Sequence, residues 1–208
     1  MHKIYTRRGS GAAAVEMLLD EFGLSYERIE VPRGQENVPA EMRRINPRGE
    51  VPVLVLPDGT VMTESAAMCI YLADLHPEAG LAPAITTPER ATYLRWMTYL
   101  AVNVYGTFMH VYHADKYHDD PATHAGIRAK AIERLAEDWA TLEAALDPGP
   151  YLLGSRISAA DIYLTMFPYW DRDRAGLFQR APRLAKLCQL VLDRPAVASA
   201  WAYHAADM

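Results

Sequence analysis

A proline-rich break between residues 76 and 88 divides the chain into two parts with different patterns. The segment, HPEAGLAPAITTP, holds three prolines and one glycine, which interrupt helices and strands alike. Before it, short strand patterns mix with helical ones. After it, apolar residues recur at helical spacing and no convincing strand pattern occurs. The sequence therefore predicts an α/β domain over residues 1–76, a linker over 77–87 and an all-α domain over 88–208.

The first part begins with a strand, a helix and a second strand. Residues 3–5 and 25–31 have strand patterns, and the helical pattern of 10–22 ends at Gly23, as helices often do. Two strands joined through a helix form a parallel unit. A short helix over 39–45 and a hairpin follow. The prediction is a small mixed sheet of four strands.

The hairpin, GEVPVLVLPDGTVMTES from Gly49 to Ser65, has a proline inside its first strand. Pro52 removes a ladder donor, so it belongs at an edge or a bend. A cis Val51–Pro52 bond would turn the backbone of Val51 outward, where it would pair with an extended peptide as an added strand does. The alternative is an edge-strand proline without a ligand.

The hairpin ends in Thr63, Glu64 and Ser65, directly before a helical pattern over 64–75. Thr63 is the predicted N-cap. Backbone N–H groups at a helix start collect carboxylates, and Ser65 adds a hydroxyl donor while Glu64 adds a charge for an ammonium group. Together they fit an α-amino acid head. The alternative is simple capping with an acidic first turn.

A third motif, RRGSGAAAVEMLL, places Ser10 between two glycines at the start of the first helix. A hydroxyl there would donate to a thiolate, and the helix dipole favours that negative charge. The alternative is that Ser10 only caps the helix. A Cys-x-x-Cys motif is missing here, so any thiol would come from the ligand.

A fourth motif, YLLGSRISAADIYL, carries Ser158 and Asp161 at capping-box spacing, with Ile157 and Ile162 placed as a hydrophobic staple. We interpret it as a folding motif, so Asp161 is expected to be structural.

Three segments together resemble the cytosolic glutathione S-transferase family, bacterial type, in order and spacing: NPRGEVPVL (46–54), TESAAMCIYL (63–72) and GSRISAADIYL (154–164). The match extends over nearly the whole chain. The resemblance implies a thioredoxin-like N-terminal domain, an all-helical C-terminal domain, a homodimer, and glutathione as co-substrate.

The resemblance also implies the roles of site residues. Val51, set by the cis-proline Pro52, would pair with the cysteinyl part of glutathione. Glu64 and Ser65 would hold its γ-glutamyl head. Ser10 would lie near the sulfur.

Two other hydroxyl donors near the sulfur stay open, Tyr5 and Thr6 at the end of the first strand. The implied activity is attack of the glutathione thiolate on a small hydrophobic electrophile. A glutathione-dependent disulfide reductase or peroxidase, or a non-catalytic glutathione-binding or ligand-carrying protein of the same fold, is the alternative.

The predicted helix over 89–114 has two faces. The expected core face consists of Leu94, Met97, Ala101, Val104 and Phe108. The opposite face gathers Trp96, Tyr99, Asn103, Gly106 and His110, with Tyr105 at the border. This second face suits either a second-substrate site, formed by Tyr99, Asn103, Tyr105 and His110, or a subunit interface.

Composition excludes several partners. The net charge of −5 argues against nucleic acid, and the sequence lacks an apolar run long enough for a membrane span. Cys69 and Cys188 are expected as buried hydrophobes in a reducing, cytoplasmic setting. The cluster HVYHADKYHDD lacks a zinc signature, so we expect a solvated helix end and no metal.

Overall fold

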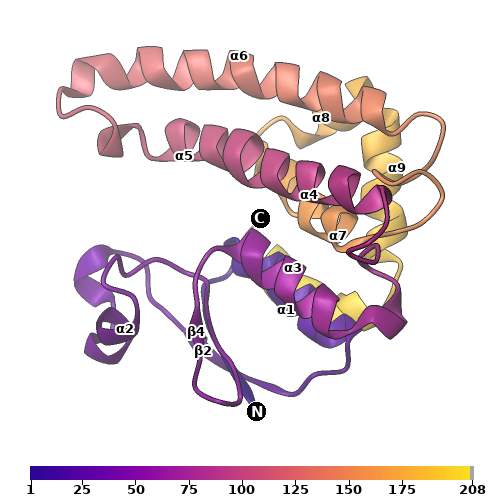
Figure 1. The fold of residues 1–208 in the computed structure, drawn as a ribbon. Helices are drawn as coiled ribbons and strands as arrows, with labels where there is room; N and C mark the ends of the chain where they lie inside the picture. Colours follow the sequence, from indigo (N-terminus) through magenta and orange to yellow (C-terminus); the bar gives the residue numbers. More distant parts are fainter. Residues whose placement is uncertain (207–208) are drawn as a thin grey trace. The chain divides into compact units, whose positions relative to one another are not determined.

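The computed structural model describes residues 1–206 as two compact units (Figure 1). The first unit combines residues 1–84 with the residues from Gln189 onward, and the second comprises Ile85–Cys188. The boundary after Ala84 falls inside the proline-rich segment. The sequence pattern alone assigns residues 88–208 to one helical domain, whereas the last helices pack in the first unit.

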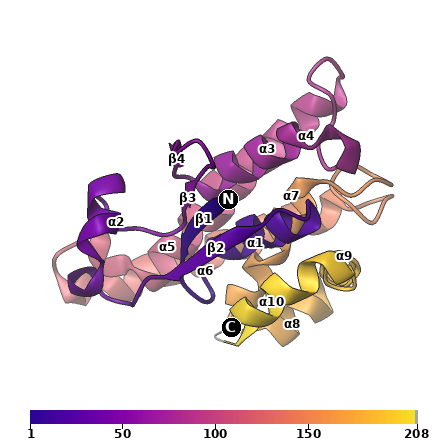
Figure 2. The ribbon, with the colours of Figure 1, turned by 90° about the horizontal axis from the view of Figure 1, so that it is seen from below.

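A mixed four-stranded sheet in the order β2-β1-β3-β4 forms the centre of the first unit (Figure 2). β1 (His2–Thr6) pairs in parallel with β2 (Tyr26–Glu30) and antiparallel with β3 (Val53–Val55). β4 (Val61–Met62) completes the hairpin with β3. The predicted parallel unit, hairpin and mixed sheet are confirmed.

The helix α1 (Ala12–Glu21) begins two residues later than the sequence pattern indicates and ends at the predicted glycine. Gly23 has a φ of 64°, which glycine adopts without steric cost. The N–H groups of Gly23 and Leu24 donate to the carbonyls of Asp20 and Leu19 at 3.0 and 2.9 Å. These two bonds form the Schellman motif that ends many helices.

Side chains alternate across the sheet, so the first unit has two apolar layers. On one face Tyr5 packs with Met42 of α2 (Ala40–Ile45). On the other face Ile4 is fully buried, and α1 and α3 (Ser65–Leu75) pack side by side. Two 3-10 turns, η1 (Gln35–Asn37) and η2 (Pro77–Ala79), belong to the connections of this unit.

The end of the chain packs against α1. The turn η6 (Pro195–Val197) and the helix α10 (Ala198–Ala205) both contact α1, and Figure 2 shows α10 beside it. The backbone N–H of Ala200 donates to Oδ2 of Asp20 at 3.1 Å. α1 is therefore enclosed by the sheet, α3 and α10, and its residues from Ala12 to Leu19 are all buried.

The second unit is helical. Its elements are α4 (Glu89–Tyr99), η3 (Leu100–Tyr105), α5 (Gly106–Tyr112), η4 (Ala114–Lys116), α6 (Pro121–Ala145), α7 (Ala159–Thr165), η5 (Phe167–Trp170), α8 (Arg174–Arg180) and the first part of α9 (Pro182–Leu192). The sequence pattern does not predict α8. α7 ends at Thr165, before the predicted Tyr169, and the 3-10 turn η5 follows with Pro168 in its first turn, where proline does not continue an α-helix.

The predicted helix over 89–114 contains a π-helical stretch, η3, and ends at Tyr112. Leu94, predicted in the core, is 38% exposed, whereas Trp96, predicted on the opposite face, is 3% exposed. The buried stripe runs through Tyr93, Met97, Leu100 and Val104 at the three- to four-residue spacing of a helix face, and it lies to one side of the predicted stripe. The predicted core positions Met97, Val104 and Phe108 are buried.

The predicted capping box is confirmed at the start of α7. Oδ2 of Asp161 accepts hydrogen bonds from the N–H and the hydroxyl of Ser158 at 2.7 and 2.8 Å. Oδ1 accepts from the N–H of Leu152 at 2.8 Å. Since Asp161 is completely buried and its bonds are internal, its role is structural.

Cys69 and Cys188 are free and buried, as predicted. Burial raises the pKa of the Cys188 thiol to about 12 and also raises the pKa of Cys69, so both stay thiols at neutral pH. Among residues 1–206, no helix has the length and apolar character that crossing a membrane requires.

Candidate functional site

Three chain segments meet at one end of the sheet in the first unit. β1 ends in the loop 7–11, which leads into α1. Since β3 is antiparallel to β1, with Tyr5 opposite Val53, the residues just before β3 lie at this same end. β4 is antiparallel to β3, so the chain leaving β4 returns there and begins α3. The register therefore brings together the start of α1, the Val51–Pro52 dipeptide and the start of α3.

Ser10 lies in the loop before α1, half-buried, with Gly11 as the N-cap. Its Oγ accepts a hydrogen bond from the N–H of Ala12 at 3.3 Å, and its carbonyl accepts from Ala13 at 3.1 Å. A hydroxyl that accepts one bond keeps its own hydrogen for donation. Gly9 has a φ of 65°, so the turn before Ser10 depends on glycine. The hydroxyl sits beside the positive end of α1.

The two alternative donors lie deeper. Tyr5 is buried and its hydroxyl donates to Oε1 of Glu41 at 3.1 Å. Burial, together with Glu41, raises the pKa of Tyr5. Thr6 is completely buried. Of the three candidates, only Ser10 has a partly accessible side chain.

The Val51–Pro52 bond is cis. The turn before it is fixed by Asn46, whose side-chain amide donates to the carbonyl of Glu50 at 2.8 Å. Gly49 has a φ of 65°, and a side chain there would meet the amide oxygen of Gln35. This turn therefore sets where Val51, which is half-buried, presents its backbone.

The start of α3 differs from the prediction in one respect. Thr63 is not the N-cap, because the helix begins at Ser65 and Glu64 occupies the N-cap position. Glu64 has a φ of 64° and is the one non-glycine residue with positive φ among residues 1–206. Such a conformation costs energy and is frequent at binding sites. Glu64 is exposed and Ser65 is buried at the helix N-terminus, where backbone N–H groups attract anions.

Two of the predicted second-substrate residues contact α6. Tyr99 donates its hydroxyl to Oδ1 of Asp138 at 2.5 Å. Burial, followed by the Asp138 bond, raises the pKa of Tyr99 to about 12. Oδ1 of Asn103 accepts from Arg134 at 3.3 Å. The polar groups of Tyr99 and Asn103 thus make contacts within the helical unit.

The other two lie among aromatic rings. Tyr105 makes edge contacts with Phe167 and Trp170, at centroid distances of 5.9 and 5.2 Å. His110 stacks on Tyr117 at 3.8 Å, and its Nδ1 lies 2.8 Å from the carbonyl of Gly106. All four candidates are half-buried on one continuous helix. The structure therefore shows an aromatic group around Tyr105 and a separate stacked pair at His110.

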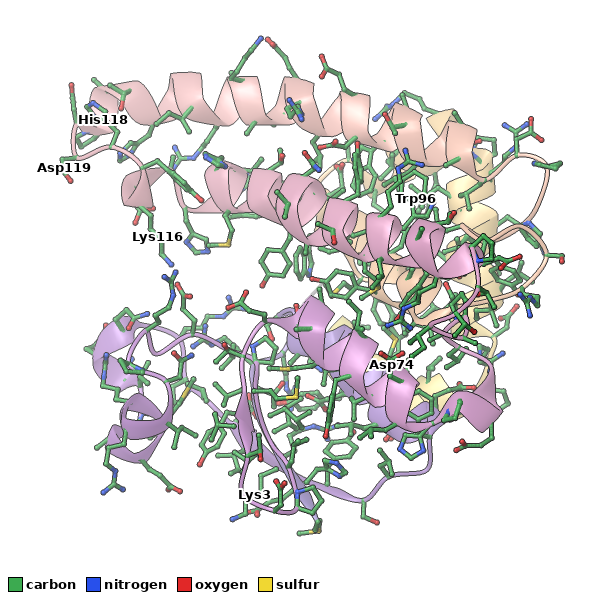
Figure 3. The ribbon with its side chains drawn as sticks, in the orientation of Figure 1. Lys3, Asp74, Trp96, Lys116, His118 and Asp119 are labelled. Atoms are coloured by element: carbon green, nitrogen blue, oxygen red, sulfur yellow. The ribbon has the colours of Figure 1, made fainter. Side chains whose placement is uncertain are left out.

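The histidine-rich segment forms the end of α5 and the turn into α6. His118 and Asp119 lie at this turn (Figure 3). Nδ1 of His118 accepts from the N–H of Asp120 at 3.0 Å, and Nε2 of His124 lies 2.7 Å from the carbonyl of His118. In residues 1–206, no group of three or more His, Cys, Asp or Glu side chains is arranged to hold a metal ion.

Two residues that shape the site are not predicted from the sequence patterns, Asn46 and Glu16. Asn46 fixes the turn before Val51, and its position directly before a Pro-x-Gly segment could have indicated this. Glu16 is completely buried in α1, and a lone carboxylate within the apolar run 12–19 was a visible anomaly.

Comparison with known proteins points to one family. Residues 12–75 match the family model for the glutathione S-transferase N-terminal domain, and residues 125–189 match that for the C-terminal domain. The glutathione S-transferase GstA of Escherichia coli O157:H7 is 26% identical over 200 residues, which cover 95% of this chain and 96% of that protein.

Solved structures of similar proteins point to the same family. A glutathione transferase from Methylococcus capsulatus is 31% identical, with 98% of each chain covered and a TM-score of 0.83. A glutathione transferase homologue from Sulfitobacter, crystallised with bound glutathione, is 28% identical, with 96% of each chain covered and a TM-score of 0.86.

Proposed function

The chain belongs to the glutathione S-transferase family, and from this premise we propose that it is a glutathione transferase acting on a small hydrophobic electrophile. The observation that carries the proposal is the convergence of three segments at one end of the sheet. A hydroxyl, the cis Val51–Pro52 segment and a helix N-terminus with a carboxylate meet there. They suit the thiol, the cysteinyl backbone and the γ-glutamyl head of glutathione.

In this proposal the γ-glutamyl head and the cysteinyl backbone of glutathione have separate partners. The α-carboxylate of the γ-glutamyl head binds Ser65 and the N-terminal N–H groups of α3, and its ammonium binds Glu64. The cysteinyl backbone pairs with Val51, in the manner of an added strand. The Sulfitobacter homologue with bound glutathione supports this ligand for the fold.

The chemistry is thiol activation. A free thiol has a pKa of about 8.5, so little thiolate exists at neutral pH. Ser10 donates its hydroxyl hydrogen to the sulfur, and the N-terminus of α1 adds favourable charge, so the thiolate is stabilised and the thiol proton leaves to solvent. The thiolate sulfur then bonds to the electrophilic carbon, and the leaving group departs with its electron pair. Positioning supplies the remaining rate enhancement.

The second substrate would bind at the aromatic side chains of the helical unit. Tyr105 and His110 offer aromatic rings on which a hydrophobic electrophile can stack. Tyr99 and Asn103 lie on the same helix, and their contacts with α6 would hold this wall in place. We also propose that residues 1–76 bind glutathione, that the second-substrate site lies within residues 88–208, that no metal is required, and that the protein is cytoplasmic.

The first prediction concerns glutathione affinity. We expect Ser65→Ala to weaken glutathione binding about tenfold, or about 1.4 kcal/mol, because the γ-glutamyl carboxylate loses a hydroxyl donor. Titration calorimetry measures this. Ser155→Ala, which removes an exposed hydroxyl from the helical unit, is the matched control and should bind as the wild type does.

Activity assays separate this function from its alternatives. Conjugation of an aryl halide supports the transferase. Reduction of a mixed disulfide or hydroperoxide without conjugation supports a reductase or peroxidase, and binding without turnover supports a ligand-carrying role. A wild-type protein that does not bind millimolar glutathione would contradict the proposed function.

A second prediction concerns assembly as a homodimer. Apolar side chains are exposed on α3 at Tyr71 and Leu75, and on the long helix at Leu94 and Val102, the last being 66% exposed. We propose that a second copy of the chain covers them. Val102→Glu should then raise the dimer dissociation constant about tenfold or more, because a carboxylate would be buried in the interface.

Light scattering after size exclusion measures the mass. Ile132→Glu is the control, because Ile132 is also exposed but lies among charged residues of α6. A wild-type monomer, or equal masses for Val102→Glu and wild type at low concentration, would contradict this assembly.

A further inference from the structure

The aromatic ring of Tyr203, on the last helix, lies against two arginines of the first unit. The guanidinium carbon of Arg28 lies 4.0 Å from the ring centroid, and that of Arg8 lies 4.8 Å from it. Both distances are within the range of cation–π attraction. Arg28 belongs to β2, whereas Arg8 belongs to the loop that carries Ser10. One ring therefore connects the end of the chain to this loop.

The loop has few other supports. Gly9 and Gly11 flank Ser10, and glycine gives a chain the greatest conformational freedom. Arg7 anchors the start of the loop, since its guanidinium donates to the carbonyls of Val31 and Pro32 at 3.0 and 2.8 Å. Arg8 has a long ion pair with Glu30, at 3.9 Å, in addition to the Tyr203 ring.

Tyr203 itself is held firmly by its neighbour. His204 and Glu16 are both completely buried, and Nε2 of His204 lies 3.1 Å from Oε1 of Glu16. Oε2 of Glu16 accepts from Nε of Arg28 at 2.6 Å. The contact between His204 and Glu16 thus holds α10 against α1. The contact between Arg28 and Glu16 places the Arg28 guanidinium against the Tyr203 ring. The ring has a fixed position from which it can hold Arg8.

We propose that Tyr203 is a positioning residue for the thiol chemistry: its ring holds Arg8, and through Arg8 it keeps the loop 7–11 where the Ser10 hydroxyl meets the glutathione sulfur. The inference rests on the proposed function, because it assigns Tyr203 a role only through Ser10. A hydroxyl displaced by a small distance loses most of its effect on a neighbouring charge, since hydrogen bonds weaken steeply with poor geometry.

The test is a double-mutant cycle on bound glutathione. The variants are Tyr203→Leu, Ser10→Ala and the double variant, and the readout is the ultraviolet thiolate absorbance as a function of pH. We expect Tyr203→Leu to raise the pKa of the bound thiol by about half a unit and to slow conjugation about threefold to tenfold. In the Ser10→Ala background, Tyr203→Leu should produce no further rise.

Tyr203→Phe is the matched control, because phenylalanine keeps the ring that contacts the guanidinium groups. The bound thiol in Tyr203→Phe should have the same pKa as in the wild type. Hydrogen exchange gives an independent readout: the amides of residues 7–13 should exchange faster in Tyr203→Leu, while those of α6 stay unchanged. If Tyr203 were only a packing residue, the effect of Tyr203→Leu on the thiol pKa would persist in the Ser10→Ala background.

The outcomes separate this inference from the proposed function. An unchanged thiol pKa in Tyr203→Leu, with a raised value in Ser10→Ala, overturns the role of Tyr203 alone. Additive effects in the double variant also overturn it. If Ser10→Ala leaves the thiol pKa unchanged, or the wild type does not bind glutathione, the proposed role of Ser10 fails and the inference fails with it.

Discussion

We expect Asp161→Ala to lower the free energy of unfolding by about 3 kcal/mol or more. The reason is that the substitution leaves the buried N–H groups of Leu152 and Ser158 without an acceptor, at about 1–3 kcal/mol each. The Ser158 hydroxyl loses its acceptor as well. Urea unfolding at pH 8, followed by tryptophan fluorescence, measures the change. At this pH the carboxyl is charged, because burial raises the pKa of Asp161 only to about 6.

Asp173→Ala is the matched control. Asp173 is the N-cap of α8, and its carboxylate likewise accepts from a backbone N–H, that of Gly176 at 3.2 Å, but it is exposed. Water replaces the lost bond at an exposed cap, so we expect a loss of about 1 kcal/mol. If the two variants lose equal stability, burial does not govern the strength of this capping box.

Features that depend on residues close together in the sequence were predictable. The Schellman glycine at Gly23, the hairpin turn and the Ser158–Asp161 capping box each depend on residues within a few positions of one another. The fold class followed from these and from the family resemblance. The start of α3 was misplaced by one residue, because the positive φ of Glu64 has no signature in its residue type.

Features that depend on distant contacts were not predictable. The pairing of Glu16 with His204 joins residues 188 positions apart, and no local pattern indicates it. For the same reason the return of α10 to the first unit was missed. On the long helix the core stripe was expected through Leu94 and Ala101, whereas the buried stripe runs through Tyr93 and Leu100. Leu94 is therefore exposed and Trp96 is buried.

We expect Glu16→Gln to lower the free energy of unfolding of the first unit by about 3 kcal/mol. Removal of one partner from a buried ion pair leaves the remaining charge without compensation, which costs about 3–5 kcal/mol. Arg28 is partly exposed and recovers some hydration, so the loss should lie at the lower end of this range. Glu27→Gln is the control, because the Lys3–Glu27 pair lies at the surface, and it should cost less than about 1 kcal/mol.

The pH dependence provides the sharper test. Burial raises the pKa of Glu16, but the hydrogen bond and charge of His204, with the charge of Arg28, outweigh it and hold the pKa below its ordinary value of 4.5. A lowered carboxyl pKa in the folded state gives stability that is present above 4.5 and is lost as the pH falls through the folded value. The difference between wild type and Glu16→Gln should therefore shrink below about pH 4.5.

Two results would contradict a stabilising role of the buried Glu16 carboxylate. One is a stability difference between wild type and Glu16→Gln that grows on acidification, and the other is a loss of stability in Glu16→Gln no larger than that in Glu27→Gln. Hydrogen exchange links this result to function. Because Glu16 holds both His204 and Arg28, its substitution should increase exchange in α10 and in the loop 7–11 together. Increased exchange in α10 alone would show that the helix and the Ser10 loop are held independently, which would remove the structural link between the chain terminus and the thiol site.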